Sequence, residues 1–164
     1  PATTPPTASP PPAPTTVNTT SLTPTSPPVT VSASDLQQQI IDLVNQERAA
    51  AGLGPVTVNA KLVQAAQIHA DDMARLDQMN HTLQGVPQPT LQSRADFVGY
   101  QFAALGENIA YNYRDAAAVM EAWMASPGHR ANILYPGFTE IGVAVAWNAY
   151  GEPYYCQVFG APAS

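Results

Sequence analysis

The order of the hydrophobic periods along the chain constrains its fold more than any other feature. Before residue 126, apolar side chains recur every three or four positions, the spacing typical of amphipathic helices. Over 141–147 large apolar residues alternate with small ones, as in a β-strand. A second apolar run, 154–159, follows a turn at 148–151, so the two runs predict a β-hairpin. Early helices and late paired strands predict an α+β fold, with helices on both sides of a small antiparallel sheet.

Local signals mark the ends of the predicted helices. Ser34 and Gln37 fit a capping box, and Asn59 is a good N-cap for a second helix. Ser126 and Pro127 suit the N-cap and first position of a short helix. The pattern predicts helices over 35–51, 60–79, 90–98 and 114–125, and a loop over 53–58.

One face of the first hairpin strand consists of small residues. Gly142, Ala144 and Ala146 occupy the positions between the large apolar ones. Because successive residues of a strand point to opposite faces, these three share a face. We therefore expect another element to pack closely over that face.

The first 33 residues differ in composition from the rest. They are rich in Pro, Thr and Ser and carry no charged side chain. Such a segment cannot bury enough apolar surface to offset the entropy lost on ordering. We expect residues 1–33 to be a disordered linker and 34–164 to be one folded domain. Linkers of this kind favour a secreted or cell-wall-associated location.

Charge and composition exclude several classes of function. The net charge is −6 and there are only six Lys and Arg residues, which disfavours binding to nucleic acid or to anionic membranes. No apolar run is long enough to span a bilayer. Cys156 is the single cysteine, so no disulfide can form within the chain. We expect a monomer stabilised by its hydrophobic core.

Four side chains are candidates for chemistry. His69 lies on the apolar stripe of the 60–79 helix, so we expect a buried core residue remote from any site. His81 follows that helix, in a loop region where functional residues collect. His129 falls in the first turn of the short helix, where the helix dipole favours neutral imidazole. Glu107 stands between apolar segments and is expected to be partly buried and hydrogen-bonded.

Sequence spacing alone does not join these residues into a site. The chain has no HExxH helix, CxxC pair, GxSxG elbow or phosphate-binding loop. Ser126 and Cys156 could act as nucleophiles, but neither has a neighbouring base in sequence. Ser126 is better explained as a helix cap and Cys156 as a strand residue.

At these positions the sequence resembles the CAP superfamily, also called the SCP-like extracellular domain, in its bacterial form. The resemblance covers nearly all of residues 36–160. It is carried by the opening helix at 41–48, the Ala-rich helix at 65–73 leading to His81, the run 106–110, and the segment 123–134 followed by 140–143 and 157–160. It implies an α-β-α sandwich.

The resemblance also implies a cleft with a tetrad of two His and two Glu. The matching positions are His81, Glu107 and His129, while Ser126 stands where eukaryotic members have the second acid. The remaining trio could hold a divalent metal ion, and Zn²⁺ is the ion expected. On this interpretation the two imidazoles lie within about 3–6 Å of each other and Glu107 is hydrogen-bonded to one of them, as ligand or as support.

The sequence leaves three functions open. The first is a binding module whose cleft recognises a small molecule, a lipid or a cell-wall component. The second is a metal-assisted hydrolase, protease-like, with Zn²⁺ on His81 and His129 and Glu107 as base or ligand. The absence of the second acid favours binding. The third is a structural spacer with a vestigial site.

Overall fold

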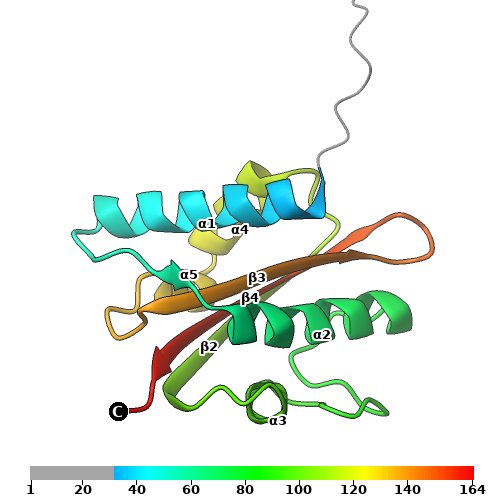
Figure 1. Ribbon diagram of the computed structural model, residues 1–164. Coiled ribbons are helices and arrows are strands. Elements are labelled where there is room, and N and C mark those ends of the chain that lie inside the picture. Colours follow the sequence, from blue (N-terminus) through cyan, green and yellow to red (C-terminus); the bar gives the residue numbers. More distant parts are fainter. Residues whose placement is uncertain (1–31) are drawn as a thin grey trace, which may run out of the picture. The chain divides into compact units, whose positions relative to one another are not determined.

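The computed structural model describes residues 32–164 (Figure 1). The predicted linker lies outside these residues except for Ser32 and Ala33, which cap and begin helix α1 (Ala33–Ala50). Ser32 Oγ accepts from the Asp35 N–H, and the Asp35 carboxylate accepts from the Ser32 N–H. The capping box predicted at Ser34 and Gln37 is therefore wrong by two residues. The earlier box is favoured because its third position holds a carboxylate, which also suits the helix dipole.

Four strands form one sheet in the order β1-β3-β4-β2. The predicted hairpin is confirmed as β3 (Glu140–Trp147) and β4 (Pro153–Pro162), which pair antiparallel. β2 (Phe102–Tyr111) was not recognised as a strand and pairs antiparallel with the other side of β4. β1 (Thr57–Val58) lies in the segment predicted to be a loop and pairs parallel with β3. That prediction is wrong because the backbone N–H groups of Thr57 and of Asn59, just after the segment, donate to the carbonyls of Thr139 and Ile141 at the sheet edge.

Helices cover both faces of the sheet, which confirms the predicted α-β-α arrangement (Figure 1). α2 (Ala60–Leu76) and α3 (Leu91–Phe97) lie on one side. α1, α4 (Ala116–Ala125) and α5 (Pro127–Ile133) lie on the other. Each face has its own cluster of buried apolar side chains. Asn59 caps α2 as predicted, through hydrogen bonds from two backbone N–H groups.

The small residues of β3 face α2. Ala144 and Ala146 belong to the core cluster on the α2 side, whereas Ile141, Val143 and Val145 belong to the opposite cluster. A Cβ atom at Gly142 would lie 2.1 Å from the carbonyl carbon of Leu62 in α2. The predicted close packing over this face is therefore confirmed, and it is a contact between helix backbone and strand backbone.

A buried arginine of α1 is hydrogen-bonded to the end of α5 and to the segment that follows it. The guanidinium of Arg48 donates hydrogen bonds to the carbonyls of Gly54, Ile133, Tyr135 and Phe138. Its side chain is almost inaccessible to solvent, and burial lowers its pKa from the usual value. Backbone carbonyls thus stabilise this cation where a carboxylate would be expected.

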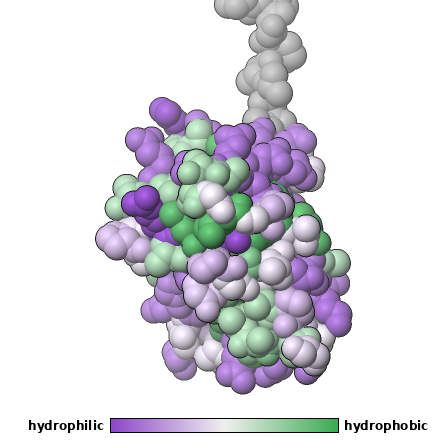
Figure 2. All heavy atoms as spheres, turned by 90° about the vertical axis from the view of Figure 1, so that its left-hand side faces the viewer, coloured by the Kyte–Doolittle hydropathy of each residue, from purple (hydrophilic) through white to green (hydrophobic). Residues whose placement is uncertain are grey.

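The surface is mixed in character. Figure 2 shows hydrophobic areas separated by hydrophilic ones on the face that it presents. Among residues 32–164, no helix has the length and apolar content that crossing a bilayer requires.

Candidate functional site

Glu107 lies at the centre of a buried polar cluster on the α2 side of the sheet. It belongs to β2, opposite Val158 of β4, and is 8% exposed. Its Oε1 is 2.9 Å from Nδ1 of His81. Its Oε2 accepts a hydrogen bond from Nη2 of Arg94, a fully buried residue of α3. The predicted hydrogen bond between Glu107 and one of the two histidines is therefore confirmed.

These partners keep Glu107 ionised. Burial alone would raise the pKa of Glu107, but the hydrogen bond from His81 and the charge of Arg94 outweigh it, and the pKa lies below its usual value. An ionised carboxylate can only accept, so Nδ1 of His81 carries the proton of the neutral ring. The Nε2 lone pair of His81 is then free, on a side chain that is 55% exposed.

His129 is held beside this cluster by two asparagines. It occupies the first turn of α5, as predicted. Nδ2 of the buried Asn108, the residue after Glu107, donates to the His129 carbonyl at 3.1 Å. Asn132 of α5 donates from its own Nδ2 to Asn108 Oδ1 and to the Glu107 carbonyl. These bonds fix α5 against β2 at the level of Glu107.

The neutral form of His129 is favoured, as the sequence suggested. Burial is the main reason that its pKa is lowered, and the charge of His81 lowers it further. The distance of about 3–6 Å expected between the rings of His81 and His129 stays a prediction.

His69 is buried as predicted, but the prediction that it is remote from the site is wrong. Its Nε2 is 3.7 Å from Glu107 Oε1, and the side chain is 1% exposed. The apolar stripe of α2 faces the sheet, and Glu107 points from the sheet toward α2. A histidine on that stripe therefore meets the carboxylate.

The burial of His69 makes stability depend on pH. Burial lowers the pKa of His69 to about 4, although the charge of Glu107 opposes the shift. Below about pH 6.5 the unfolded chain takes up a proton at this residue and the folded chain does not. The free energy of unfolding should therefore fall by about 2 kcal/mol between pH 7.5 and pH 5 through His69.

Urea unfolding of the parent and of His69→Leu at both pH values measures this contribution. The parent should lose more stability on acidification than the variant, because leucine cannot titrate. Equal losses in the two proteins would show that His69 does not contribute.

Neither candidate nucleophile has the setting for catalysis. Cys156 is a strand residue of β4, as predicted, and is fully buried. Its Sγ is 3.6 Å from Glu107 Oε2, and burial raises its thiol pKa well above the usual value. Ser126 occupies the N-cap position of α5, but its side chain makes no capping hydrogen bond. The predicted N-cap position of Ser126 is therefore confirmed, but its hydroxyl does not satisfy any N–H group of the helix.

Ser126 instead lines a surface pocket together with His129. The pocket has a volume of ≈ 270 Å³. Its remaining lining is largely apolar and aromatic: Met79, Ile109, Ala110, Tyr111, Tyr113, Ala122 and Trp123. Nε1 of Trp123 donates to the Ile109 carbonyl, so the polar atom of the indole is already satisfied. The site thus combines a His/Glu centre with an adjoining apolar hollow.

The donor set can be compared with what a metal ion requires. Among residues 32–164, no group of three or more His, Cys, Asp or Glu side chains is arranged to hold a metal ion. Both oxygens of Glu107 already accept hydrogen bonds, one of them from an arginine, so Glu107 does not fit as a direct ligand. His81, whose Nδ1 is bonded to Glu107 and whose side chain is exposed, and His129 have the chemistry of metal ligands, and a site shared by the two stays a prediction.

Three residues of this centre were missed from the sequence. Arg94 was not considered, Asn132 entered only as part of the 123–134 segment of the resemblance, and Asn108 was noted only as a neighbour of Glu107. One signal was available for Arg94: a buried glutamate needs a cation or several donors, and the chain has only six Lys and Arg. No comparable signal pointed to the asparagines.

Comparison with known proteins decides the family. Residues 41–159 match CAP, the cysteine-rich secretory protein family. The chain belongs to the CAP family. The CAP domain is 37% identical to YkwD of Bacillus subtilis over 134 residues, which cover 80% of this chain and 49% of that protein. This chain therefore spans about half the length of that curated relative.

Solved structures agree with this assignment. An extracellular protein of Bacillus anthracis that contains an SCP domain superposes with a TM-score of 0.71 at 30% identity, covering 78% of this chain and 41% of that one. An outer surface protein of Borrelia burgdorferi superposes with a TM-score of 0.70 at 19% identity, covering 77% of this chain and 92% of that one. The latter likeness shows the CAP fold alone.

Proposed function

We propose that this CAP domain is a secreted binding module whose cleft takes a small ligand between the His81–Glu107–His129 centre and the adjoining apolar pocket. One observation carries the proposal. Glu107 orients His81 through a hydrogen bond to Nδ1, while His129 and Ser126 line a pocket that is otherwise apolar. A few polar groups converging on an apolar hollow are the usual design of a small-ligand site. A ligand with an apolar body and one polar group, such as a lipid or a cell-wall fragment, matches this lining.

Secretion is supported by two independent features. The similar protein from Bacillus anthracis is described as an extracellular protein. The Pro-, Thr- and Ser-rich composition of residues 1–33 is typical of a linker outside the cytoplasm.

Binding is favoured over hydrolysis by the state of Glu107. A general base must have a free lone pair aimed at the reacting water. Glu107 is buried and its pKa is held below the usual value by His81 and Arg94, which makes it a weak base, and Ser126 stands in place of a second acid. Any Zn²⁺ held here would polarise a ligand oxygen or bridge it to the protein. His81 and His129 would hold the ion, and Glu107 would fix the His81 tautomer.

Calorimetric titration with Zn²⁺ tests the polar half of the site. We expect one weak to moderate site per chain at pH 7.5, with binding lost on acidification because protonated imidazole cannot ligate. His81→Ala and His129→Ala should each lower the affinity at least about tenfold, since each removes one of two strong ligands. Both residues are partly or largely exposed, so the variants should stay folded.

The third histidine provides the matched control. His69→Leu removes an imidazole near Glu107 without touching either proposed ligand and should bind Zn²⁺ like the parent. Unchanged affinity in both His81→Ala and His129→Ala would contradict the proposed centre.

A further inference from the structure

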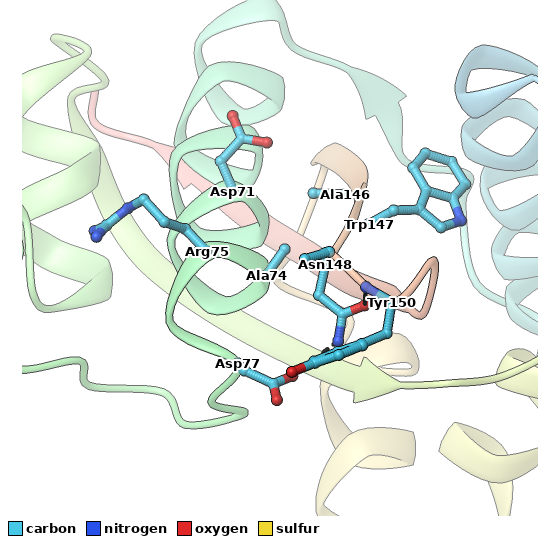
Figure 3. A pocket seen from close by; sticks show the side chains of 9 residues that line it. Asp71, Ala74, Arg75, Asp77, Ala146, Trp147, Asn148 and Tyr150 are labelled. Atoms are coloured by element: carbon cyan, nitrogen blue, oxygen red, sulfur yellow. Dashed lines mark hydrogen bonds between the residues drawn. The ribbon is translucent and has the colours of Figure 1, made fainter.

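The hollow between α2 and the β3–β4 turn does not have the form of a ligand site. Its volume is ≈ 630 Å³, but Figure 3 shows the ring of Trp147 and the guanidinium of Arg75 pointing away from it. In a ligand site, the polar and aromatic groups converge on the ligand. An interaction surface is better supported along β2, at the edge of the sheet.

One edge of β2 is not paired with another strand of the sheet. β2 stands last in the order β1-β3-β4-β2, so only its other edge is bonded to β4 (Figure 1). In an antiparallel pair, alternate residues direct both of their backbone groups to the partner strand. The hydrogen bond from the Asn112 N–H to the Pro153 carbonyl places the even-numbered residues of 104–112 on the β4 side. The backbone groups that point to the unpaired edge are therefore those of Leu105, Glu107, Ile109 and Tyr111.

At this edge the carbonyls are partly satisfied, whereas the N–H groups are not. Nε1 of Trp123 donates to the Ile109 carbonyl and Nδ2 of Asn132 donates to the Glu107 carbonyl, which also confirms that these carbonyls point away from β4. Within residues 32–164, the N–H groups of the same two residues and of Leu105 and Tyr111 make no hydrogen bond. The edge therefore presents a row of donors, spaced about 6.8 Å apart because they lie on every second residue. Such a row pairs with a ligand that brings regularly spaced acceptors.

Two pockets border the unpaired edge of β2. The pocket beside His129 is lined by Ile109 and Tyr111 of β2, and α4 and α5 lie on its other side. A second pocket, of ≈ 330 Å³, is lined by Leu105 of β2, by Ala131 of α5 and by the ring of Phe138, among others. Leu105 and Ile109 are four residues apart, about 14 Å along the strand.

This spacing matches an extended peptide. Residues four positions apart in a strand project to the same side, so one peptide chain can place a side chain in each pocket. Its alternate carbonyls have the same spacing as the N–H groups of β2. Neither a lipid chain nor a sugar ring carries acceptors at this interval along its length, and an added strand is an established way of recognising a peptide.

We propose that the unpaired edge of β2 binds an extended peptide as an added strand. Carbonyls of the peptide accept from the N–H groups of β2, and two apolar side chains, four residues apart, occupy the two pockets. The inference rests on the proposed function, because the pocket beside His129 belongs to both, and it names the ligand class of that site. The peptide would run past Glu107, so the His81–Glu107–His129 centre lies at the middle of the bound segment.

A series of peptides with NMR detection tests the proposal. The probes are acetyl-Thr-X-Thr-Thr-Thr-Z-Thr-amide, with Leu, Phe or Ala at X and Z, because threonine favours the extended conformation. We expect a Kd of about 0.1–1 mM for the Leu and Phe peptides, and binding at least about fivefold weaker for the peptide with Ala at both positions. At saturation, amide hydrogen exchange of Leu105 and Ile109 should slow at least about tenfold, since their N–H groups become bonded. The amides of Gly106 and Asn108, already bonded to β4, should change little.

Variants that fill the pockets give the matched comparison. Ala122→Trp fills the pocket beside His129 and Ala131→Trp fills the other, so each should weaken peptide binding at least about fivefold. Ala117→Trp is the control, because Ala117 is exposed on the same helix as Ala122 and lines neither pocket, and this variant should bind like the parent. Thermal unfolding checks that all three variants are folded.

Three outcomes would overturn the proposal. They are that no peptide of the series binds at about 5 mM, that both pocket variants bind like the parent, or that binding leaves the exchange of the Leu105 and Ile109 amides unchanged. Zn²⁺ titration separates this failure from failure at the histidines. Ala131→Trp should bind Zn²⁺ like the parent, and a parent that binds Zn²⁺ but none of the peptides would contradict the added strand alone.

Discussion

Glu107→Leu should lower the free energy of unfolding by about 3–5 kcal/mol, the usual loss when one partner of a buried ion pair is removed. The variant leaves the guanidinium of Arg94 fully buried without its carboxylate. Two of the Arg94 nitrogens, Nε and Nη1, already have no hydrogen-bond partner among the described residues, so no other group can compensate. Urea unfolding at pH 7.5 measures the loss.

Two further variants separate charge burial from simple packing. Arg114→Gln breaks the solvent-exposed Arg114–Asp115 pair and should change stability by less than about 1 kcal/mol. The double variant Arg94→Met, Glu107→Leu replaces both charges by apolar side chains and should recover most of the loss. A double variant as unstable as Glu107→Leu would show that packing, and not the unpaired charge, is responsible.

Gly142→Ala should lower the free energy of unfolding by at least about 3 kcal/mol, at or beyond the upper end of overpacking effects. The added methyl group would meet three backbone atoms of α2: the carbonyl carbon and oxygen of Leu62 and the nitrogen of Val63, all within 2.3 Å. Backbone atoms cannot rotate away as a flexible side chain can, so α2 must move off the sheet. Thermal and urea unfolding both measure the effect.

Gly54→Ala is the control for this substitution. A Cβ atom at Gly54 would have no other atom within 4 Å, and the change from glycine alone should alter stability by less than about 1 kcal/mol. If Gly142→Ala were as stable as Gly54→Ala, the close contact between β3 and α2 would not exist in solution.

The helices and the hairpin could be predicted because their signals are local. Asn59 before an amphipathic run and the alternation after residue 140 each lie within a few residues, and both predictions are confirmed. β1 and β2 could not be predicted in the same way. β1 has two residues, too few for an alternation, and most of β2 from Gly106 onward is buried on both faces, which removes the alternation itself.

The candidate site was predictable only in part. Family resemblance selected His81, Glu107 and His129, and the structure brings Glu107 to His81. The place of His69 was misjudged because the stripe of α2 was treated as purely apolar, without asking which strand residue it would face. Arg94 follows a loop whose path no local rule gives, so its contact with Glu107 emerges only from the assembled sheet.

The order of strands also determines when the site can assemble. β2, which carries Glu107, pairs within the sheet only with β4, and β4 is the last strand of the described chain. As the polypeptide emerges from the ribosome or an export channel, β2 appears well before its partner. Until β4 is available, Glu107 and Arg94 must remain hydrated, because burying them without the sheet would leave their polar groups unsatisfied. Assembly of the site therefore has to wait until β4 has been made. Incomplete chains that end at the β3–β4 turn should lack it, even though α1, α2 and β3 have already been made.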